Sequence, residues 1–385
     1  MNLRALYLFG AVAALFPAAC AAQDRPVELA AEVTVDLVGQ MAGACDRKLR
    51  ALTNVDLTAD LDLAALAGWD GATMHVYVLD NRGARPNDVI GTLQGVDNIE
   101  VPDAGLRLFE AWVEQGLGGG ASLRAGLYDV NSEFYANDAA VMLIAPPFGI
   151  GSEIAATGPN GPSIFPSSAL AARIHVPVGT DGAFVRAAVI NARASTIGDA
   201  GGVDFSFRDG VLLMGEVGRS GARLRGAVGV WAYSRDPEDL FETTPDGMPL
   251  RKPSRGIYGV LEGDLVASES GTVTAFFRAG LSDRHATPFG GGFQAGALMA
   301  PVVASRPDSR VSLGLHHAWT NRHFRDQQRL AGVTAGNETV VELTVSDTLA
   351  PSLTVQPDVQ WIHNPGGIQG ASDAVVAIMR VIFSF

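Results

Sequence analysis

Ionic and aromatic side chains recur at every second position in several segments of this 385-residue chain. In one segment Glu110, Trp112 and Glu114 share a parity, and in the next Arg124 and Tyr128 do so. Guanidinium and carboxylate groups exchange charge-assisted hydrogen bonds with polar groups, and aromatic faces pack against apolar surfaces. The spacing therefore predicts a polar surface that contacts small molecules, rather than a centre that carries out a reaction.

Common catalytic and cofactor motifs do not occur in the sequence. It contains no G-x-S-x-G, H-E-x-x-H, C-x-x-C or Walker sequence. The adjacent His316 and His317 would point to opposite faces of a strand, so they cannot reach one metal ion without a bulge. A formal net charge of −13 argues against nucleic-acid binding. We therefore expect no enzyme activity, no cofactor, no metal site and no nucleic-acid partner.

The elements that position these side chains follow a period of two. In residues 223–233 one parity carries Leu, Gly, Val, Val and Ala, and the other carries Arg, Arg, Ala, Gly, Trp and Tyr. The same division occurs in 121–128, 353–361 and 375–385. Turn signals such as Asp70-Gly71 separate such segments, and this pattern is typical of antiparallel strands joined by tight connections.

The polar parity distinguishes between two all-β folds, a soluble sandwich and an outer-membrane barrel. The ionic residues that we assign to the interior are Glu110, Glu114, Arg124, Arg173, Arg186, Glu216, Arg223, Arg225, Glu262, Arg278, Glu338, Glu342 and Asp358. These are too many for a closed core, whereas a water-filled lumen accommodates them. We predict an all-β fold, a transmembrane antiparallel barrel of about 16 strands with an aqueous channel.

The N-terminus resembles an export signal. A short positive segment, an apolar core and small residues precede Asp24, so we expect a signal peptide over 1–22 and a single barrel domain over 23–385. Acylation at Cys20 is the alternative, although Pro17 stands where an aliphatic residue would be expected. No later segment has 18 continuous apolar residues. The aromatic Phe385, at the end of an alternating segment, resembles the signal read by the barrel-assembly machinery.

Three connections exceed ordinary hairpin turns, at 129–168, 234–255 and 318–337. In the first, residues 137–145 could form a short helix, and many Pro and Gly residues follow. We expect this connection to fold into the barrel and constrict it. The alternative is a disordered external loop. The second connection is predicted to be a solvated external loop.

Four segments together resemble the carbohydrate-selective porins of Gram-negative outer membranes, the OprB type. They are 61–73 (LDLAALAGW followed by GAT), 108–115 (LFEAWVEQ), 123–134 (LRAGLYDVNSEF) and 356–367 (QPDVQWIHNPGG), the last being the most specific. The resemblance extends from about residue 50 to the end of the chain, and residues 180–300 match only loosely. It implies an outer-membrane barrel, surrounded by lipid, through which sugars and similar small solutes diffuse into the periplasm.

A sugar route of this kind would use rings for stacking and ions for hydrogen bonding to hydroxyl groups. The candidate pore-lining or sugar-contact residues are Glu110, Trp112, Glu114, Arg124, Tyr128, Arg173, Arg186, Arg223, Arg225 and Gln360. We expect Trp231 and Trp361 to be wall or interface aromatics instead. Two alternatives stay open at this point: a general or different-solute channel, and a secreted soluble β-rich carbohydrate-binding protein.

Overall fold

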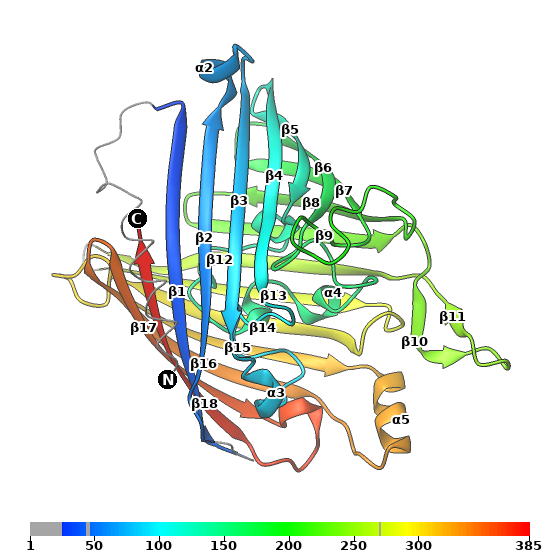
Figure 1. Cartoon of the computed structure of the whole chain (residues 1–385). Helices are drawn as coiled ribbons and strands as arrows, with labels where there is room; N and C mark the ends of the chain where they lie inside the picture. The colour runs from blue at the N-terminus through cyan, green and yellow to red at the C-terminus, as the bar shows by residue number, and fades with distance from the viewer. Residues whose placement is uncertain (1–24, 44–46, 269–270) are drawn as a thin grey trace.

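The computed structural model describes residues 25–43, 47–268 and 271–385, so the predicted signal peptide over 1–22 lies outside the described residues. Sixteen antiparallel strands form a closed barrel, in which each strand pairs with its sequence neighbours and β18 closes the ring against β1 (Figure 1). The barrel strands are β1 (Val27–Ala42), β2 (Arg50–Asp62), β3 (Ala72–Gly83), β4 (Gly105–Gly118), β5 (Ala121–Tyr128), β6 (Ala169–Val178), β7 (Ala183–Asn191), β8 (Val211–Ser220), β9 (Leu224–Tyr233), β12 (Arg255–Ser268), β13 (Gly271–Ser282), β14 (Phe289–Ala300), β15 (Arg310–Thr320), β16 (Glu338–Ala350), β17 (Leu353–His363) and β18 (Ala374–Ser384). The predicted all-β barrel and its strand number are confirmed.

The remaining elements lie in the connections. They are the hairpin strands β10 (Glu238–Thr243) and β11 (Pro249–Arg251), the helices α2 (Leu63–Ala67), α3 (Asn87–Ile90), α4 (Ser152–Ala155) and α5 (Arg322–Leu330), and the 3-10 turns η1 (Val130–Ser132), η2 (Pro146–Phe148) and η3 (Pro365–Gly367). None of the helices in the described residues is long and apolar enough to cross a membrane.

The alternation of the sequence becomes an outer and an inner face of the wall. On β9, Val228 and Val230 are 52% and 53% exposed, whereas Trp231 is 2% exposed and faces inward. Exposed aliphatic side chains also mark alternate positions of β7, β8, β16 and β17. An apolar outer face is stable only where lipid replaces water, so the wall has the surface of a membrane barrel.

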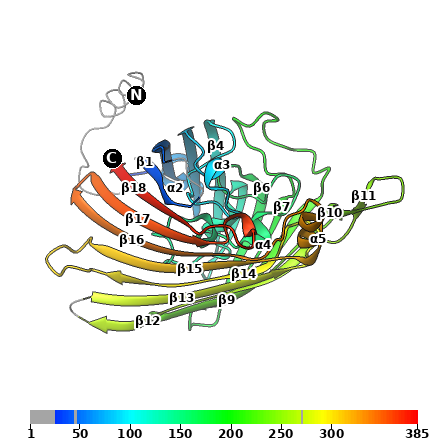
Figure 2. The same ribbon diagram turned by 90° about the horizontal axis from the view of Figure 1, so that it is seen from below.

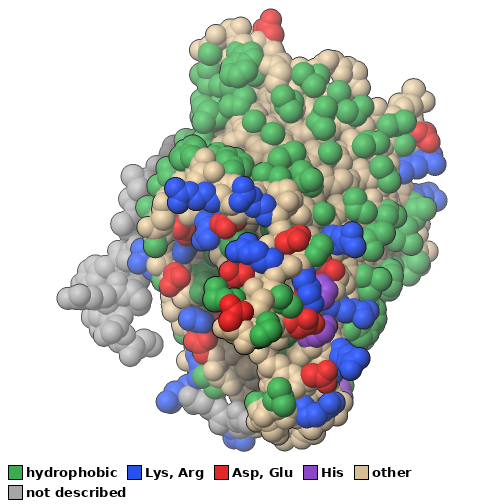
Figure 3. Space-filling model, turned by 90° about the vertical axis from the view of Figure 1, so that its right-hand side faces the viewer, with side chains coloured by type: hydrophobic (Ala, Val, Ile, Leu, Met, Phe, Trp, Pro, Cys, Tyr) green, Lys and Arg blue, Asp and Glu red, His purple; other side chains and the backbone are tan. Residues whose placement is uncertain are grey.

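The two ends of the barrel differ. The shorter connections lie at the end where β1 begins and β18 ends. There Gly119 and Gly120 join β4 to β5 with positive φ angles of 60° and 79°. The long connections lie at the other end. Figure 3 faces the side that carries β10, β11 and α5, where charged side chains gather, while hydrophobic side chains cover the wall beside them.

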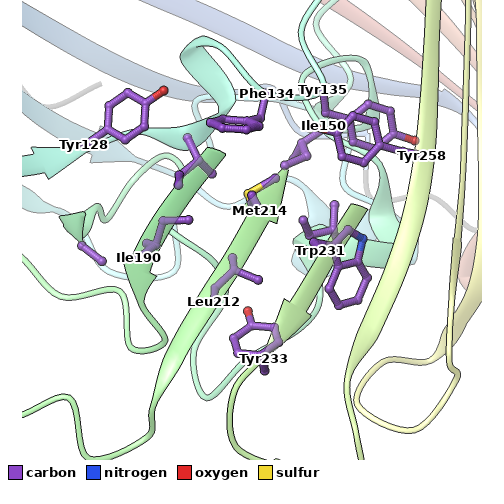
Figure 4. Packing of buried hydrophobic residues seen from close by; sticks show 14 of the residues in the cluster. Tyr128, Phe134, Tyr135, Ile150, Ile190, Leu212, Met214, Trp231, Tyr233 and Tyr258 are labelled. Atoms are coloured by element: carbon purple, nitrogen blue, oxygen red, sulfur yellow. The ribbon is translucent and has the colours of Figure 1, made fainter. Parts of the chain in front are cut away.

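The connection 129–168 lies inside the ring of strands, as α4 does in Figures 1 and 2. Its Phe134, Tyr135 and Ile154 pack in one buried cluster with inward residues of β8, β9 and β12, including Trp231 (Figure 4). Burial of these large side chains holds the connection against the wall through the hydrophobic effect. The connection thus packs against inward residues of the wall, and its role as a constriction stays a prediction.

The helix expected over 137–145 is not formed. The segment consists of turns. The backbone N–H of Ala139 donates to a carboxylate oxygen of Glu262 at 2.5 Å, and that of Ala145 donates to Glu342 at 3.0 Å. Wall carboxylates thus take the donors that a helix would direct along its own axis.

A second inward connection was not expected from the sequence. Residues 84–104, between β3 and β4, contain α3 and then follow the inner wall beside 129–168, where Asn98 N–H donates to the carbonyl of Ile144 at 3.0 Å. By contrast, the connection 234–255 projects from the barrel as the hairpin β10–β11, as Figure 1 shows.

Candidate functional site

Wall carboxylates hold connection 129–168 in the lumen. Glu216 accepts from Tyr135 N–H at 3.2 Å, and Glu262 accepts from the Asn137 side chain at 3.1 Å. Glu342 accepts from Ile144 N–H as well as from Ala145. These glutamates are buried, so part of the predicted interior charge bonds to loop backbone instead of facing water. The physical reason is that unpaired backbone N–H groups inside the barrel need acceptors.

Arg278 on β13 performs the complementary task for loop carbonyls. Its Nη1 donates to the carbonyls of Tyr135 at 3.0 Å and Gly149 at 2.9 Å, and its Nη2 donates to Pro147 at 2.6 Å. The guanidinium is buried. A planar group with several fixed donors can gather three carbonyl groups that lie on different turns. Arg278 therefore fixes the shape of the loop as well as its position.

Segment 84–104 is held in the same way by β16, β17 and β18. Glu338 accepts from Leu93 N–H at 2.8 Å, Gln360 donates to the carbonyl of Val96 at 2.8 Å, and Arg380 donates to Asn98 at 2.7 Å. These contacts join residues more than two hundred positions apart in the chain. They bring two connections together along one side of the lumen.

The structure brings most of the predicted site residues together. Arg124 Nη2 lies 2.6 Å from a carboxylate oxygen of Glu114, and Arg173 Nη2 lies 2.7 Å from the same oxygen. Arg173 Nε donates to Glu133 at 2.7 Å, and Arg186 Nε lies 3.6 Å from Glu216. We call this set the wall network; its members are Glu114, Arg124, Glu133, Arg173, Arg186 and Glu216.

Three arginines and three glutamates make the wall network electrically balanced. Tyr128 adds a hydrogen bond of 2.5 Å to Glu133, and Arg173 is buried. Part of the network borders a cavity of about 510 Å³ near the turn between β4 and β5. Because each arginine is paired with a glutamate, the network exerts only a weak electric field on an ion in the lumen.

Trp112 is placed in the predicted patch, but its ring is enclosed. The Arg124 guanidinium lies 3.7 Å from the ring centroid, and the ring of His75 stacks on the indole at 5.0 Å. His75 and Arg124 come from strands on either side of β4, so they cover the two faces. The indole Nε1 donates to Glu110 at 3.2 Å. The half-buried indole thus already contacts wall residues through its ring and its Nε1, and its sugar-contact role stays a prediction.

Three predicted site residues lie elsewhere. Arg223 is exposed in the turn before β9 rather than on the inner wall, because the chain reverses there. Arg225 is partly exposed and lies 3.2 Å from Asp138 of the inward loop. Gln360 faces inward, but segment 84–104 covers it, and its side chain is fully buried. Of the two tryptophans set aside, Trp231 is a buried wall residue and Trp361 is exposed on the outer face.

A larger cavity lies between the two inward connections and the wall formed by β1, β2, β3, β17 and β18. It measures about 670 Å³, within the range of roughly 300–1,000 Å³ that is usual for small-molecule sites. Five of its lining residues are acidic and Arg380 is the single basic one in the described lining. We call it the acidic cavity; its acidic residues are Glu32, Asp56, Asp97, Glu100 and Asp129.

Neutral polar and aromatic groups also line the acidic cavity. The Tyr77 hydroxyl donates to Asp56 at 2.6 Å, and Phe165 contributes a half-buried ring. The amide side chains in the lining are those of Asn54, Gln94, Asn98, Asn131 and Gln356. Burial, with the nearby charge of Glu110, raises the pKa of Asp129 to about 8. The cavity thus offers rings, amides and carboxylates to one solute.

The acidic cavity was missed by sequence reasoning because the second inward connection, 84–104, was not identified. That connection contributes Asp97 and Glu100 to the lining. A usable signal existed in 84–104, where Pro86, Gly91, Gly95 and Pro102 interrupt any strand over a stretch too long for a hairpin turn. Asp129 and Asn131 also lie within the family-like segment 123–134, directly after the predicted patch.

Comparison with known proteins agrees with this architecture. The high-pH structure of Pseudomonas putida OprB superimposes with a TM-score of 0.84 at 19% identity, over 94% of this chain and 95% of that one. Its low-pH structure gives 0.59 at 18% identity, over 94% and 93%. The outer-membrane channel DcaP of Acinetobacter baumannii gives 0.58 at 12% identity, over 93% and 97%. At these identities the likeness establishes the fold.

A curated relative from Acinetobacter baylyi, named "Putative porin QuiX", is 27% identical over 97 residues. The match spans only about a fifth of either chain, 21% of this one and 22% of the relative. The family model described as "Carbohydrate-selective porin, OprB family" matches residues 46–385, which is most of the sequence. Together with the closed barrel, the apolar outer face and the inward connections, this match shows that the chain belongs to the OprB family of carbohydrate-selective porins of the outer membrane.

Proposed function

We propose that sugars and similar small polar solutes diffuse passively into the periplasm through the acidic cavity. The observation that carries this proposal is the position of the cavity: both inward connections and the strand wall line it, and it shares Asp97, Glu100 and Pro146 with a further cavity of about 190 Å³ among the residues of segment 84–104. Solutes that pass the long-loop end meet the smaller cavity and then the larger one.

The lining suits a neutral polyol. Its carboxylates and amide oxygens accept hydrogen bonds from hydroxyl groups, and the amide nitrogens and Tyr77 supply donors. The rings of Tyr77 and Phe165 offer surfaces to the apolar face of a pyranose. Many weak, exchangeable contacts replace the hydration of a solute without holding it too tightly, which passive passage requires.

We assign the wall network a positioning role. Glu133 belongs to the inward connection and is held by Arg173, while Glu110 accepts from Asp129 N–H at 2.8 Å. These bonds fix the point at which the chain leaves β5 and enters the lumen. The sugar-contact role that the sequence suggested for Trp112, Arg124 and their neighbours is therefore replaced, in this proposal, by support of the constriction.

Contacts with membrane lipid and with the barrel-assembly machinery belong to the same proposal. The exposed aliphatic face of β9 supplies the lipid contact. The Phe385 side chain is partly exposed, and its backbone N–H bonds to the Ala31 carbonyl at 2.9 Å, so the aromatic ring sits beside the seam where β18 closes on β1.

Liposome swelling tests the proposed function. Vesicles that contain the refolded protein should swell in isotonic glucose at a rate that rises with protein content. In planar bilayers, glucose should reduce the single-channel current in a saturable manner. Channels that ignore every sugar would contradict the carbohydrate route, and folded protein that forms no channels would contradict the pore itself.

A further inference from the structure

The acidic cavity contains a buried carboxylate that its neighbours do not neutralise. Arg380 on β18 forms two hydrogen bonds to the carboxylate of Asp36 on β1, at 3.0 Å through Nε and 2.6 Å through Nη2. The same Nη2 is 3.5 Å from Oδ1 of Asp97. One cation therefore stands between two carboxylates, and the better geometry belongs to Asp36.

The two oxygens of Asp97 differ in their contacts. Oδ1 accepts a hydrogen bond from the backbone N–H of Ile99 at 3.0 Å. Oδ2 has no hydrogen-bond partner among residues 25–43, 47–268 and 271–385, although the residue is only 2% exposed. A buried carboxylate oxygen without a donor is unfavourable, and a donor from outside the chain would relieve it.

Asp97 also lies on the proposed solute route. It lines both the 670 Å³ and the 190 Å³ cavity, as does Glu100. Further along the larger cavity lie Glu32, Asp56 and Asp129, while Arg380 is its only basic residue in the described lining. The unpartnered oxygen thus belongs to a residue that borders both cavities, where acidic residues outnumber basic ones.

We propose that this junction binds the ammonium group of a cationic polyol, such as an amino sugar, with Asp97 Oδ2 as its main acceptor and Glu100 as its neighbour. The inference rests on the proposed sugar route and deepens it by naming a solute class. An ammonium group supplies three donors and one positive charge, which satisfies the free oxygen and balances the second carboxylate. Hydroxyl groups of the same solute would use the amides and rings described above.

The electrostatics of Asp97 should make binding at this site depend on pH. Burial and the adjacent Asp36 raise the pKa of Asp97 above its usual range, so a proton competes with an ammonium group for the site. The charged groups around it are Asp36 on β1, Arg380 on β18 and, on its own segment, Glu100 and Arg85. Two of these groups are positive, and loss of the Asp97 proton adds a negative charge to the site, so binding of a cation should strengthen as the pH rises.

Single-channel block of the full-length protein tests the proposal, with glucose, glucosamine and glucuronate as probes at pH 7. A charge-assisted hydrogen bond should let glucosamine block at about tenfold lower concentration than glucose, and glucuronate should block least. In a KCl gradient the zero-current potential should show preference for potassium. Block by glucosamine, normalised to the fraction of the amine that is protonated, should also strengthen as the pH rises.

Asp97→Asn is the decisive variant, because an amide keeps one oxygen as the acceptor for Ile99 and replaces the other, with its charge, by an NH2 group. Glucosamine and glucose should then block at similar concentrations, and the loss of the difference between them is the readout. Glu100→Gln is a second variant that should reduce the difference if Asp97→Asn does not assemble. Glu238→Gln, on the exposed hairpin, is the matched control and should retain the difference.

The outcomes separate the two proposals. Equal block by glucose and glucosamine in the unmodified protein, or a difference that survives Asp97→Asn, would overturn the cation site and leave the sugar route intact. Loss of glucose block in the unmodified protein would instead overturn the proposed function. Preference for chloride over potassium would also contradict the cation site.

Discussion

The wall network and the acidic cavity use similar residue types in opposite ways. In the network, Arg173 contacts Glu114 and Glu133 at 2.7 Å, and the charges balance. In the cavity, Arg380 faces five lining carboxylates, and Asp97 keeps an oxygen without a partner among the described residues. The charged groups of the network pair with one another, whereas the described residues supply no hydrogen-bond donor to Oδ2 of Asp97 in the cavity.

This difference teaches that the number of charges on a pore wall does not identify the route. A buried pair stabilises the wall only while both partners are present, and it contributes little external field. Unbalanced groups act on whatever enters. Pairing, rather than residue type, therefore distinguishes the structural part of this lumen from the part that meets solutes.

The largest expected effect comes from breaking the network. Arg173→Ala should lower the free energy of unfolding by about 3–5 kcal/mol, because Glu114 and Glu133 would lose a buried partner. Urea titration followed by heat-modifiable gel mobility measures the change. As a control, Arg219→Ala removes an exposed contact with Asp181 and should cost at most about 1 kcal/mol. A similar loss in both variants would show that the network is not a special stabilising unit.

A smaller effect is expected from Glu153 on α4, a fully buried carboxyl group of the inward loop that lies near Arg278. The Tyr135 hydroxyl donates to it at 2.9 Å, and burial raises the pKa of Glu153 to about 7. Docking of the loop is therefore strongest when this carboxyl is protonated. It should weaken from about pH 4.5 to 7 by up to roughly 3 kcal/mol and then level off.

Hydrogen exchange of the amides around α4, corrected for intrinsic rates, measures this docking. Glu153→Gln should flatten the change over that pH range, since a neutral amide does not titrate. Glu238→Gln on the exposed hairpin should follow the unmodified protein. If the slope persists in Glu153→Gln, another group controls the docking.

A third prediction compares the loss of a ring from the acidic cavity with the loss of a ring that packs on Arg124 of the wall network. Phe165→Ala removes a ring from the acidic cavity and should weaken glucose block about fivefold, equivalent to about 1 kcal/mol of stacking. Trp112→Ala removes a ring that Arg124 and His75 enclose, so block should stay within about twofold, even though stability falls. The reverse pattern in single-channel titrations would return the sugar contact to the network.

The smallest effect is expected at Arg223. Its side chain is exposed in a turn at the end of the barrel, outside both regions. Arg223→Ala should change the free energy of unfolding by less than about 0.5 kcal/mol and leave conductance unaltered. A marked fall in conductance would mean that the turn end contributes to the route, contrary to its position in this structure.

Much of the barrel was determined by local sequence. Alternation places successive side chains on opposite faces whatever the rest of the chain does, so inward residues such as Glu114, Arg124 and Arg173 could be assigned from parity. Strand number followed from length, and Pro and Gly residues marked 129–168 as an irregular connection. Contacts between neighbouring strands, including Glu114 with Arg124, needed only the antiparallel order.

Only the tertiary structure decided which of these charges are satisfied. Asp36 meets Arg380 because the barrel closes, and Glu342 meets Ile144 because a loop enters the lumen. The unexpected entry of 84–104 buried Gln360 and placed Asp97 between two cavities. Such contacts depend on which distant backbone groups require acceptors once the ring is shut. Parity fixes where a side chain points, but the folded loops fix what it meets.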